Sequence, residues 1–278
     1  MKHIVGFSGG VDSQAAALWV RQRFPAEDII LLNTNAGRNE NHLTEAFIRQ
    51  YSEDVFPVVT VTAIHSDLWK TEGFAETKGY DSNAELTFED MIRIKKRPPS
   101  RKAQFCTTIL KLAPQKRWVE QNVTDDYERY TGVRRDESES RKNYPFREWD
   151  NYFDCYVNHP LADWTKKQCF DFITSHGEEF NPLYKLGFNR VGCAPCINSS
   201  KNDILNWLQR FPEEIEKIRR YESNTGRTYF APCVPGLSMN NIDQVVEWAR
   251  TSRGGRQIDL IKVTEVRPNC ESKYGLCE

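Results

Sequence analysis

The sequence predicts an α/β fold in which an open, mostly parallel, doubly wound sheet precedes a helical, cysteine-bearing C-terminal part. In the first half of the chain, short apolar runs that suit strands alternate with segments that suit helices. A glycine-rich turn over residues 8–13 joins the first apolar run to the first helical segment. Seven of the eight cysteines lie at or beyond position 155, where helical patterns dominate.

The first sixty residues contain three expected strands and two expected helices. Residues 29–32 are an uninterrupted apolar run, which is typical of a strand buried on both faces. Leu43, Phe47 and Tyr51 recur every four residues and predict a helix over 40–51. Strands that alternate with helices favour parallel pairing with right-handed crossovers. The other elements are strands over 2–7 and 56–61 and a helix through 15–20 that ends before Pro25.

The rest of the chain is expected to be mainly helical. The basic stretch from Arg93 to Lys102 holds two prolines and is expected to form a mobile or ligand-dependent loop. A further strand over 127–133 leads into a charged loop over 134–147. Helices are expected through 110–119 and over 163–177, 201–222 and 241–252.

Composition excludes several classes of protein. The 38 Lys and Arg residues nearly balance the 39 Asp and Glu residues, so no broad polybasic field would bind nucleic acid through charge alone. No run of about 18 apolar residues occurs, so no helix is expected to span a membrane. The glycine turn follows Met1 too closely for a signal peptide, and a soluble, cytoplasmic protein is expected. In a reducing cytosol, eight cysteines suit metal, redox or core positions better than disulfides.

The turn after the first strand is a candidate phosphate site. Glycines between a strand and a helix let backbone N–H groups face a ligand, and the positive end of the helix dipole points to the same place. The Lys-Ser/Thr ending of a Walker loop is absent, and an ordinary glycine-rich turn is the alternative. The residues expected to hold phosphates are Ser8, Gly9, Gly10, Val11, Asp12 and Ser13.

A polar segment follows the second expected strand. Ligands of open parallel sheets lie at the carboxyl ends of the strands, so this segment is expected to flank the adenine or ribose of a nucleotide. A simple polar turn is the alternative. These loops place a nucleotide-binding domain within residues 1–165 and leave 166–278 as a helical, cysteine-rich region with a mobile tail. The residues assigned to the nucleotide in this segment are Asn33, Thr34, Gly37 and Arg38.

Four motifs, in the same order along the chain, resemble one family. Residues 8–13 resemble the PP-loop of the ATP pyrophosphatase superfamily. Residues 105–114 resemble a Cys-Thr-x-x-Leu-Lys-x-x-Pro segment, residues 132–141 resemble Gly-x-Arg-x-x-x-Ser-x-x-Arg, and residues 160–164 match Pro-Leu-x-Asp-Trp. Over roughly residues 3–200 the chain is therefore similar to the phosphoadenosine-phosphosulfate (PAPS) reductase-like family, which has the adenine nucleotide alpha-hydrolase-like fold.

The resemblance implies a ligand and a set of charged residues that act on it. The ligand would be ATP, adenosine phosphosulfate (APS) or PAPS. Asp12 would help to hold Mg²⁺ in a member that cleaves ATP between the α and β phosphates. Arginine side chains suit oxyanions because their N–H groups form a planar fork. The residues with these roles would be Lys111, Arg134 and Arg141 at the oxyanions and Gly132 at the nucleotide.

Cys193 and Cys196 form a Cys-x2-Cys turn that suits a tight thiolate knuckle. Iron–sulfur members of the family have such a pair at the corresponding place, so the resemblance implies a [4Fe-4S] cluster here. Cys106 and Cys233 would complete the four thiolates. A zinc site and an unmetallated redox pair are the alternatives.

The C-terminal tail carries Cys270 and Cys277. Sulfonucleotide reductases hold a nucleophilic cysteine on a mobile tail, and a terminal thiol is free to swing. Cys277 is therefore a candidate catalytic residue, with an accidental resemblance as the alternative because the local order of residues differs. Cys155 and Cys169 lie among aromatic residues and are expected in the core.

Three functions are compatible with these features. The first is an ATP pyrophosphatase that transfers AMP to an acceptor oxygen, which sulfur then replaces. Its acceptor would be a nucleic acid, steered by the 93–102 stretch, or a small molecule, and a sulfur donor or reductant protein would be its partner. The second is a sulfonucleotide reductase that releases sulfite, and the third is a non-enzymatic nucleic-acid-binding module. The sequence leaves open whether the chain forms a homo-oligomer.

Overall fold

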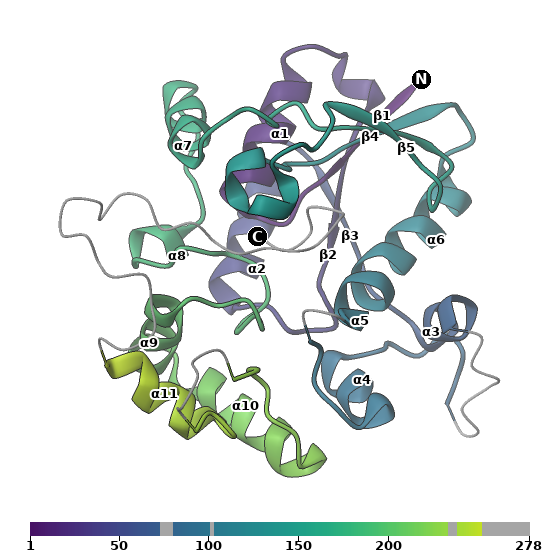
Figure 1. The fold of residues 1–278 in the computed structure, drawn as a ribbon. Helices are drawn as coiled ribbons and strands as arrows, with labels where there is room; N and C mark the ends of the chain where they lie inside the picture. Colours follow the sequence, from purple (N-terminus) through teal and green to yellow (C-terminus); the bar gives the residue numbers. More distant parts are fainter. Residues whose placement is uncertain (73–79, 101–102, 233–237, 252–278) are drawn as a thin grey trace.

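The computed structural model describes residues 1–72, 80–100, 103–232 and 238–251. Its centre is a six-stranded sheet with the order β3-β2-β1-β4-β6-β5 (Figure 1). All neighbouring strands pair in parallel except β5, which pairs antiparallel with β6. The prediction of an open, mostly parallel α/β sheet is confirmed. The strands are β1 (Lys2–Gly6), β2 (Ile29–Thr34), β3 (Val58–Val61), β4 (Tyr127–Tyr130), β5 (Arg147–Asp150) and β6 (Cys155–Asn158).

Helices cover both faces of the sheet because successive strand residues point to opposite sides. Val5 and Leu31 belong to one hydrophobic core, which three helices complete. Ile4 and Leu32 point the other way and pack with Val119 in a separate core. The helices of the first core are α1 (Val11–Arg21), α2 (His42–Asp54) and α7 (Lys166–Ser175), whereas α6 (Ala113–Asn122) covers the opposite face.

A further hydrophobic core lies beyond the carboxyl ends of the strands, where α10 lies between α4 and the other C-terminal helices (Figure 1). Phe88 and Met91 share this core with Trp207, Ile218 and Val245. Apolar packing thus joins the C-terminal helices to a segment of the first half of the chain. The boundary at residue 165 stays a prediction. The helices concerned are α4 (Phe88–Lys95), α8 (Pro182–Lys185), α9 (Lys201–Arg210), α10 (Pro212–Thr225) and α11 (Ile242–Arg250).

The segment between β3 and β4 contains more helix than its weak pattern predicted. Helix α3 (His65–Glu72) follows β3, and α4 begins with a capping box between Thr87 and Asp90. Because α4 continues to Lys95, the basic stretch that was expected to be a loop starts inside a helix. A short helix, α5 (Phe105–Thr107), and a π-helical turn (Thr108–Leu112) then lead directly into α6.

Two further predictions about secondary structure are corrected. The helix expected over 201–222 is two helices, since Pro212 cannot continue the hydrogen-bond ladder and begins α10 instead. The charged segment after β4 contains only short 3₁₀ turns, but its end forms β5, which pairs with β6 as a hairpin. Strands of four residues with mixed composition give little periodic signal. No helix in the described ranges is long and apolar enough to cross a membrane.

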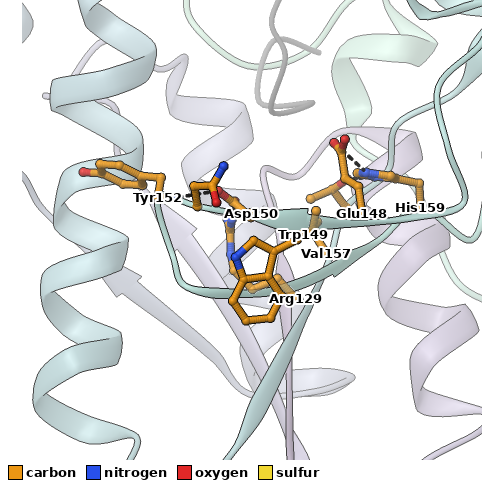
Figure 2. Close-up of a pocket in the computed structure, with 9 residues that line it drawn as sticks. Arg129, Glu148, Trp149, Asp150, Tyr152, Val157 and His159 are labelled. Carbon is orange, nitrogen blue, oxygen red and sulfur yellow. Dashed lines mark hydrogen bonds and ion pairs between the residues drawn. The ribbon is translucent and has the colours of Figure 1, made fainter.

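A chain of buried polar side chains crosses the α6 face of the sheet. Gln115 Nε2 donates to Thr34 Oγ1 (3.0 Å), and Arg129 Nη2 donates to Gln115 Oε1 (3.4 Å). Arg129 Nη1 lies 3.0 Å from Asp150 Oδ2. Figure 2 shows Arg129, Asp150 and His159 around a cavity of about 60 Å³. Since these side chains are buried, the charge of Arg129 is compensated by Asp150 rather than by water.

We expect the Asp150→Asn variant to lose about 3 kcal/mol of unfolding free energy, because Arg129 would remain as an uncompensated buried charge. Urea-induced unfolding followed by circular dichroism measures this loss. The control is Asp171→Asn, whose carboxylate pairs with Lys167 on the surface and should cost less than about 1 kcal/mol. Equal losses of unfolding free energy in the two variants would contradict the expectation that Arg129 becomes a buried, uncompensated charge.

His159 should make folding sensitive to acid. Its Nδ1 lies 2.8 Å from Thr131 Oγ1, and its Nε2 lies 3.7 Å from Glu148 Oε1 (Figure 2). Burial, followed by the charges of Arg141 and Arg129, lowers its pKa from 6.5 to about 4. The folded state therefore binds the proton more weakly than the unfolded state, and stability is lost as the pH falls through this range.

The stability of the wild type relative to His159→Asn is expected to fall by about 3 kcal/mol between pH 7 and pH 4, at about 1.4 kcal/mol per pKa unit. Urea unfolding of both proteins at a series of pH values measures the difference. A difference that does not change with pH would show that this imidazole titrates equally in the folded and unfolded chains.

Candidate nucleotide site and cysteine turn

The phosphate loop, residues 8–13, is held by its own hydroxyl groups. Ser8 N donates to Ser13 Oγ (3.1 Å), and Ser13 Oγ donates to Gly10 O (2.9 Å). Gly9 has a φ of +77°, and a Cβ there would lie 3.1 Å from Ile48 Cγ1. Glycine therefore suits both the backbone conformation and the space at this position. The loop ends at the N-terminus of α1, which is an arrangement that binds anions.

The segment after β4 closes over the start of α1. A Cβ on Gly132 would lie 2.5 Å from the carbonyl carbon of Asp12, so this contact requires glycine. Arg134 Nε lies 2.8 Å from Asp12 Oδ1, and the Arg134 side chain is 1% exposed. Burial opposes the charge of Arg134, but the carboxylates of Asp12 and Asp136 raise its pKa above the ordinary value. The structure thus brings three predicted site residues together, with two of them paired to each other.

The second arginine of the motif is also paired inside the protein. Arg141 forms an ion pair with Glu137, and both side chains are no more than 3% exposed. Arg134 forms another ion pair with Asp136. In this structure both arginines stabilise the 132–141 segment by compensating its carboxylates. Their contact with an oxyanion stays a prediction.

The loop over residues 33–40 follows β2 and meets Lys111. Thr34 Oγ1 donates to the carbonyl oxygen of Lys111 (3.4 Å), in the π-helical turn. Lys111 is 8% exposed, and its ammonium group interacts electrostatically with Glu40. Lys111 is therefore a buried cation at the carboxyl end of β2, and its contact with a nucleotide stays a prediction.

Gly37 and Arg38, two residues predicted to contact the nucleotide, face α4 and solvent instead of the cavity described below. Gly37 has a φ of +68°, and a Cβ there would lie 2.6 Å from Phe88 N, so it fixes the loop against α4. The Arg38 side chain is 70% exposed and pairs with Glu85. The assignment of these two residues to the nucleotide stays a prediction.

A cavity of about 400 Å³ lies between α2 and the strands β2 and β3, and its lining extends from Val58 at the start of β3 to Asn33 and Asn35 at the end of β2. Ile48 lines the cavity and is also the side chain nearest to Gly9, so the cavity is adjacent to the phosphate loop. Asn33 is 4% exposed, and its Nδ2 donates to Thr60 Oγ1 (3.3 Å). The polar residues of the wall are Asn33, Asn35, Glu40, Glu45, Arg49 and Glu53, with Ser52 and Thr60.

Glu40 joins this cavity to the cysteine turn. Burial raises the pKa of Glu40 to about 7, while Lys111 acts in the opposite direction. The main chain of Glu40 forms an antiparallel bridge with Cys193, and Ala194 N donates to Asn39 O (2.8 Å). The 33–40 loop and the Cys-x2-Cys turn are therefore held together by backbone contacts.

Tyr229 holds the cysteine turn from the other side. Its hydroxyl donates to Pro195 O (2.9 Å), between the two cysteines of the turn. Burial, with Cys196, Cys193 and Cys106 nearby, raises the Tyr229 pKa well above the ordinary value. In the parts of the chain that the structure describes, no three His, Cys, Asp or Glu side chains form a group that could hold a metal ion. The remaining predicted cysteines, Cys233, Cys270 and Cys277, lie outside the described residues.

The sequence did not point to Glu40, Tyr184 or Tyr229. Tyr184 Oη accepts a hydrogen bond from Val11 N (3.0 Å), in the first turn of α1. The two tyrosines reach the site only through tertiary folding, and no local motif marks them. Glu40 follows the polar segment after β2 by a few residues, so a search for carboxylates at the strand end would have found it.

Comparisons with known proteins agree with this arrangement. The family model of the phosphoadenosine phosphosulfate reductase domain matches residues 2–199. An uncharacterized 37.8 kDa protein of Escherichia phage 186 is 34% identical over 215 residues, which are 69% of this chain and 64% of that protein. An adenosine 5′-phosphosulfate reductase of Allochromatium vinosum is 37% identical over 103 residues, 34% of this chain and 36% of the reductase. The chain thus matches less than two thirds of the length of either relative.

Among solved structures, a phosphoadenylyl-sulfate reductase from Candida auris in a phosphate complex aligns with a TM-score of 0.46 and 16% identity, covering 69% of this chain and 81% of that one. The fold assignment rests on the sheet topology described above. The family model covers most of the chain, from β1 to the residues just before α9. The chain therefore belongs to the phosphoadenosine phosphosulfate reductase family.

Proposed function

We propose that the chain is an enzyme that binds ATP and transfers AMP to an acceptor oxygen, which sulfur then replaces. The proposal rests on the position of the cavity next to the phosphate loop. The side chain of Ile48 separates the two. A nucleotide needs an anion-binding turn for its phosphates and a pocket of roughly 300–1,000 Å³ for the rest. The cavity of about 400 Å³ is within this range.

In this proposal the phosphates lie on the phosphate loop and the nucleoside enters the cavity. Asp12 fits Mg²⁺, because that ion binds through one or two carboxylates together with substrate phosphates. Bound Mg²⁺ would neutralise charge on the departing pyrophosphate. Arg134 pairs with the Asp12 carboxylate and so holds it in position at the start of α1. Lys111 supplies a second cation at the same strand edge.

The acceptor and the partners belong to the same proposal. The acceptor would be a nucleic acid or a small molecule, and a separate sulfur donor or reductant protein would complete the reaction. The basic stretch of residues 93–102 would guide a nucleic-acid acceptor, since Arg93 is an exposed residue of α4 whose ion pair is with Asp90 of the same helix.

A second candidate function is reduction of a sulfonucleotide to sulfite. The sequence match to adenosine 5′-phosphosulfate reductases favours it. It would use the same loop and cavity, with Cys277 as the attacking thiol. The two candidates differ in the nucleotide that binds and in the need for Mg²⁺.

Calorimetric titrations with ATP and Mg²⁺, with APS and with PAPS test the proposal. We expect ATP to bind, and Gly132→Ala to weaken binding at least about tenfold, or 1.4 kcal/mol, because the new Cβ would displace the first turn of α1. Gly226→Ala is the control, since a Cβ there meets no atom within 4 Å while the φ of +62° strains any side chain, so this variant measures backbone strain without a steric clash. Failure of all three nucleotides to bind would overturn the proposal, and preference for APS or PAPS would favour the reductase.

We extend the proposal to a [4Fe-4S] cluster at the cysteine turn. Thiolates are the ligands that iron–sulfur clusters select, and three thiols lie near the Tyr229 hydroxyl. Cys106, Cys193 and Cys196 would bind the cluster with Cys233 as the fourth ligand. A bound cluster would carry electrons or sulfur for the second step. Tyr229 would keep the turn in place through its hydrogen bond to Pro195.

Anaerobically purified protein is expected to contain about four iron and four sulfide ions per chain, and Cys196→Ser should lose most of both because one thiolate ligand is missing. Colorimetric iron and sulfide assays measure this. Cys169→Ser is the control, since Cys169 is buried in the core beside α1. One equivalent of zinc without iron would instead establish the zinc alternative.

A further inference from the structure

The hydroxyl group of Tyr184 reaches the phosphate loop from a distant part of the chain. Its Oη accepts a hydrogen bond from Val11 N (3.0 Å), the first amide of α1. Gly10, the N-cap residue of this helix, has no side chain that could accept the same bond. Amides of the first helical turn have no partner inside the helix, and in a phosphate loop they face the anion. Tyr184 Oη therefore contacts one of the groups that would face a bound phosphate.

Two sets of contacts fix the position of Tyr184. The centroid of its ring lies 5.1 Å from that of Phe170 on α7 and 6.3 Å from that of Phe180. Asn181, the N-cap residue of α8, is fully buried, and its Nδ2 donates to Thr44 Oγ1 of α2 (3.2 Å). Moving the hydroxyl away from the phosphate loop would disturb these contacts. We therefore expect Tyr184 to stay in place when a ligand binds.

The hydroxyl group can bind the Val11 amide and an anion at the same time. The bond from Val11 uses a lone pair of the hydroxyl oxygen, and a phenolic hydroxyl also has a proton to donate. Accepting one hydrogen bond polarises the hydroxyl and strengthens the bond that it donates. An ionised phosphate supplies acceptors, and its hydrogen bonds are charge-assisted. The contact between Tyr184 and Val11 is only partly buried, so a ligand on the loop can reach the hydroxyl.

We propose that Tyr184 is a phosphate-binding residue whose hydroxyl, held by the Val11 amide, donates a hydrogen bond to the phosphate at the start of α1. The inference rests on the proposed function, which places the nucleotide phosphates on the phosphate loop. Helix α8 thus supplies a side-chain donor next to an amide that the tyrosine already occupies. The phosphate site would combine residues from both sides of the predicted boundary at residue 165.

Inorganic pyrophosphate and adenosine test the two ends of the nucleotide separately. Calorimetric titration of the full-length Tyr184→Phe variant measures its affinity for each compound and for ATP with Mg²⁺. The variant keeps the aromatic ring and loses only the hydroxyl. We expect pyrophosphate and ATP to bind about tenfold more weakly than to the wild type, because one charge-assisted hydrogen bond is lost. Adenosine, which has no phosphate, should bind within about twofold of the wild-type affinity.

Tyr51→Phe is the matched control. It also removes a hydroxyl that accepts a hydrogen bond, in this case from Arg21 Nη1 (2.9 Å). Arg21 is the last residue of α1, so this bond lies at the opposite end of the helix from the phosphate loop. The affinities of Tyr51→Phe for all three ligands should stay within about twofold of those of the wild type. Circular dichroism and urea unfolding verify that both variants are folded.

The outcomes separate this inference from the proposed function. Unchanged affinity for pyrophosphate in Tyr184→Phe would overturn the inference and leave the hydroxyl as a cap of α1. Tighter binding would also overturn it, because the phosphate would then compete with the hydroxyl for the Val11 amide. Equal losses for adenosine and pyrophosphate would indicate a general loosening of the site and contradict a phosphate contact. If the wild type binds neither pyrophosphate nor ATP, the proposed function falls and this inference falls with it.

Discussion

The contact between the segment after β4 and the first turn of α1 is the constraint on which the candidate site depends. Gly132 lies so close to Asp12 that no side chain fits between them, and Arg134 places its guanidinium on the Asp12 carboxylate. Both members of this ion pair are buried, so removing Arg134 would leave the Asp12 carboxylate without this compensation, whereas Arg134 would keep its pair with Asp136 if Asp12 were removed. The phosphate loop and the 132–141 segment therefore form a single structural unit.

This unit is surrounded by segments that reach it from distant parts of the sequence. Ile48 of α2 lies against Gly9, Tyr184 of α8 accepts from the amide of Val11, and Thr34 contacts the Lys111 turn. They meet because the carboxyl ends of parallel strands lie at one edge of a sheet. The Cys-x2-Cys turn joins the same edge through its bridge to Glu40. A change in the conformation of the 33–40 loop would thus be transmitted to the Cys-x2-Cys turn through these backbone contacts.

The sequence predicted those features that depend on local patterns. Alternating apolar and helical segments indicated the α/β sheet, and the Ser8–Ser13 string lies between β1 and α1 as expected. The β5–β6 hairpin was not predicted, because four-residue strands of mixed composition show no periodic pattern. The capping box at Thr87, by contrast, is a local sequence signal for the start of α4. The pairing of Arg134 with Asp12 could not be read from sequence, because it depends on how β4 lies beside β1.

The same ion pair also separates the two candidate functions. In both candidate functions the phosphate loop would bind the 5′-phosphates, which ATP and sulfonucleotides share, so the loop alone does not choose between them. Cleavage of ATP with Mg²⁺ would require the Asp12 carboxylate to contact both the metal ion and Arg134. Attack of a thiol on a sulfonucleotide would need no metal ion at Asp12, so the Asp12–Arg134 ion pair would stay intact. The choice between the two chemistries therefore depends on whether the buried Arg134 can share the Asp12 carboxylate with a metal ion.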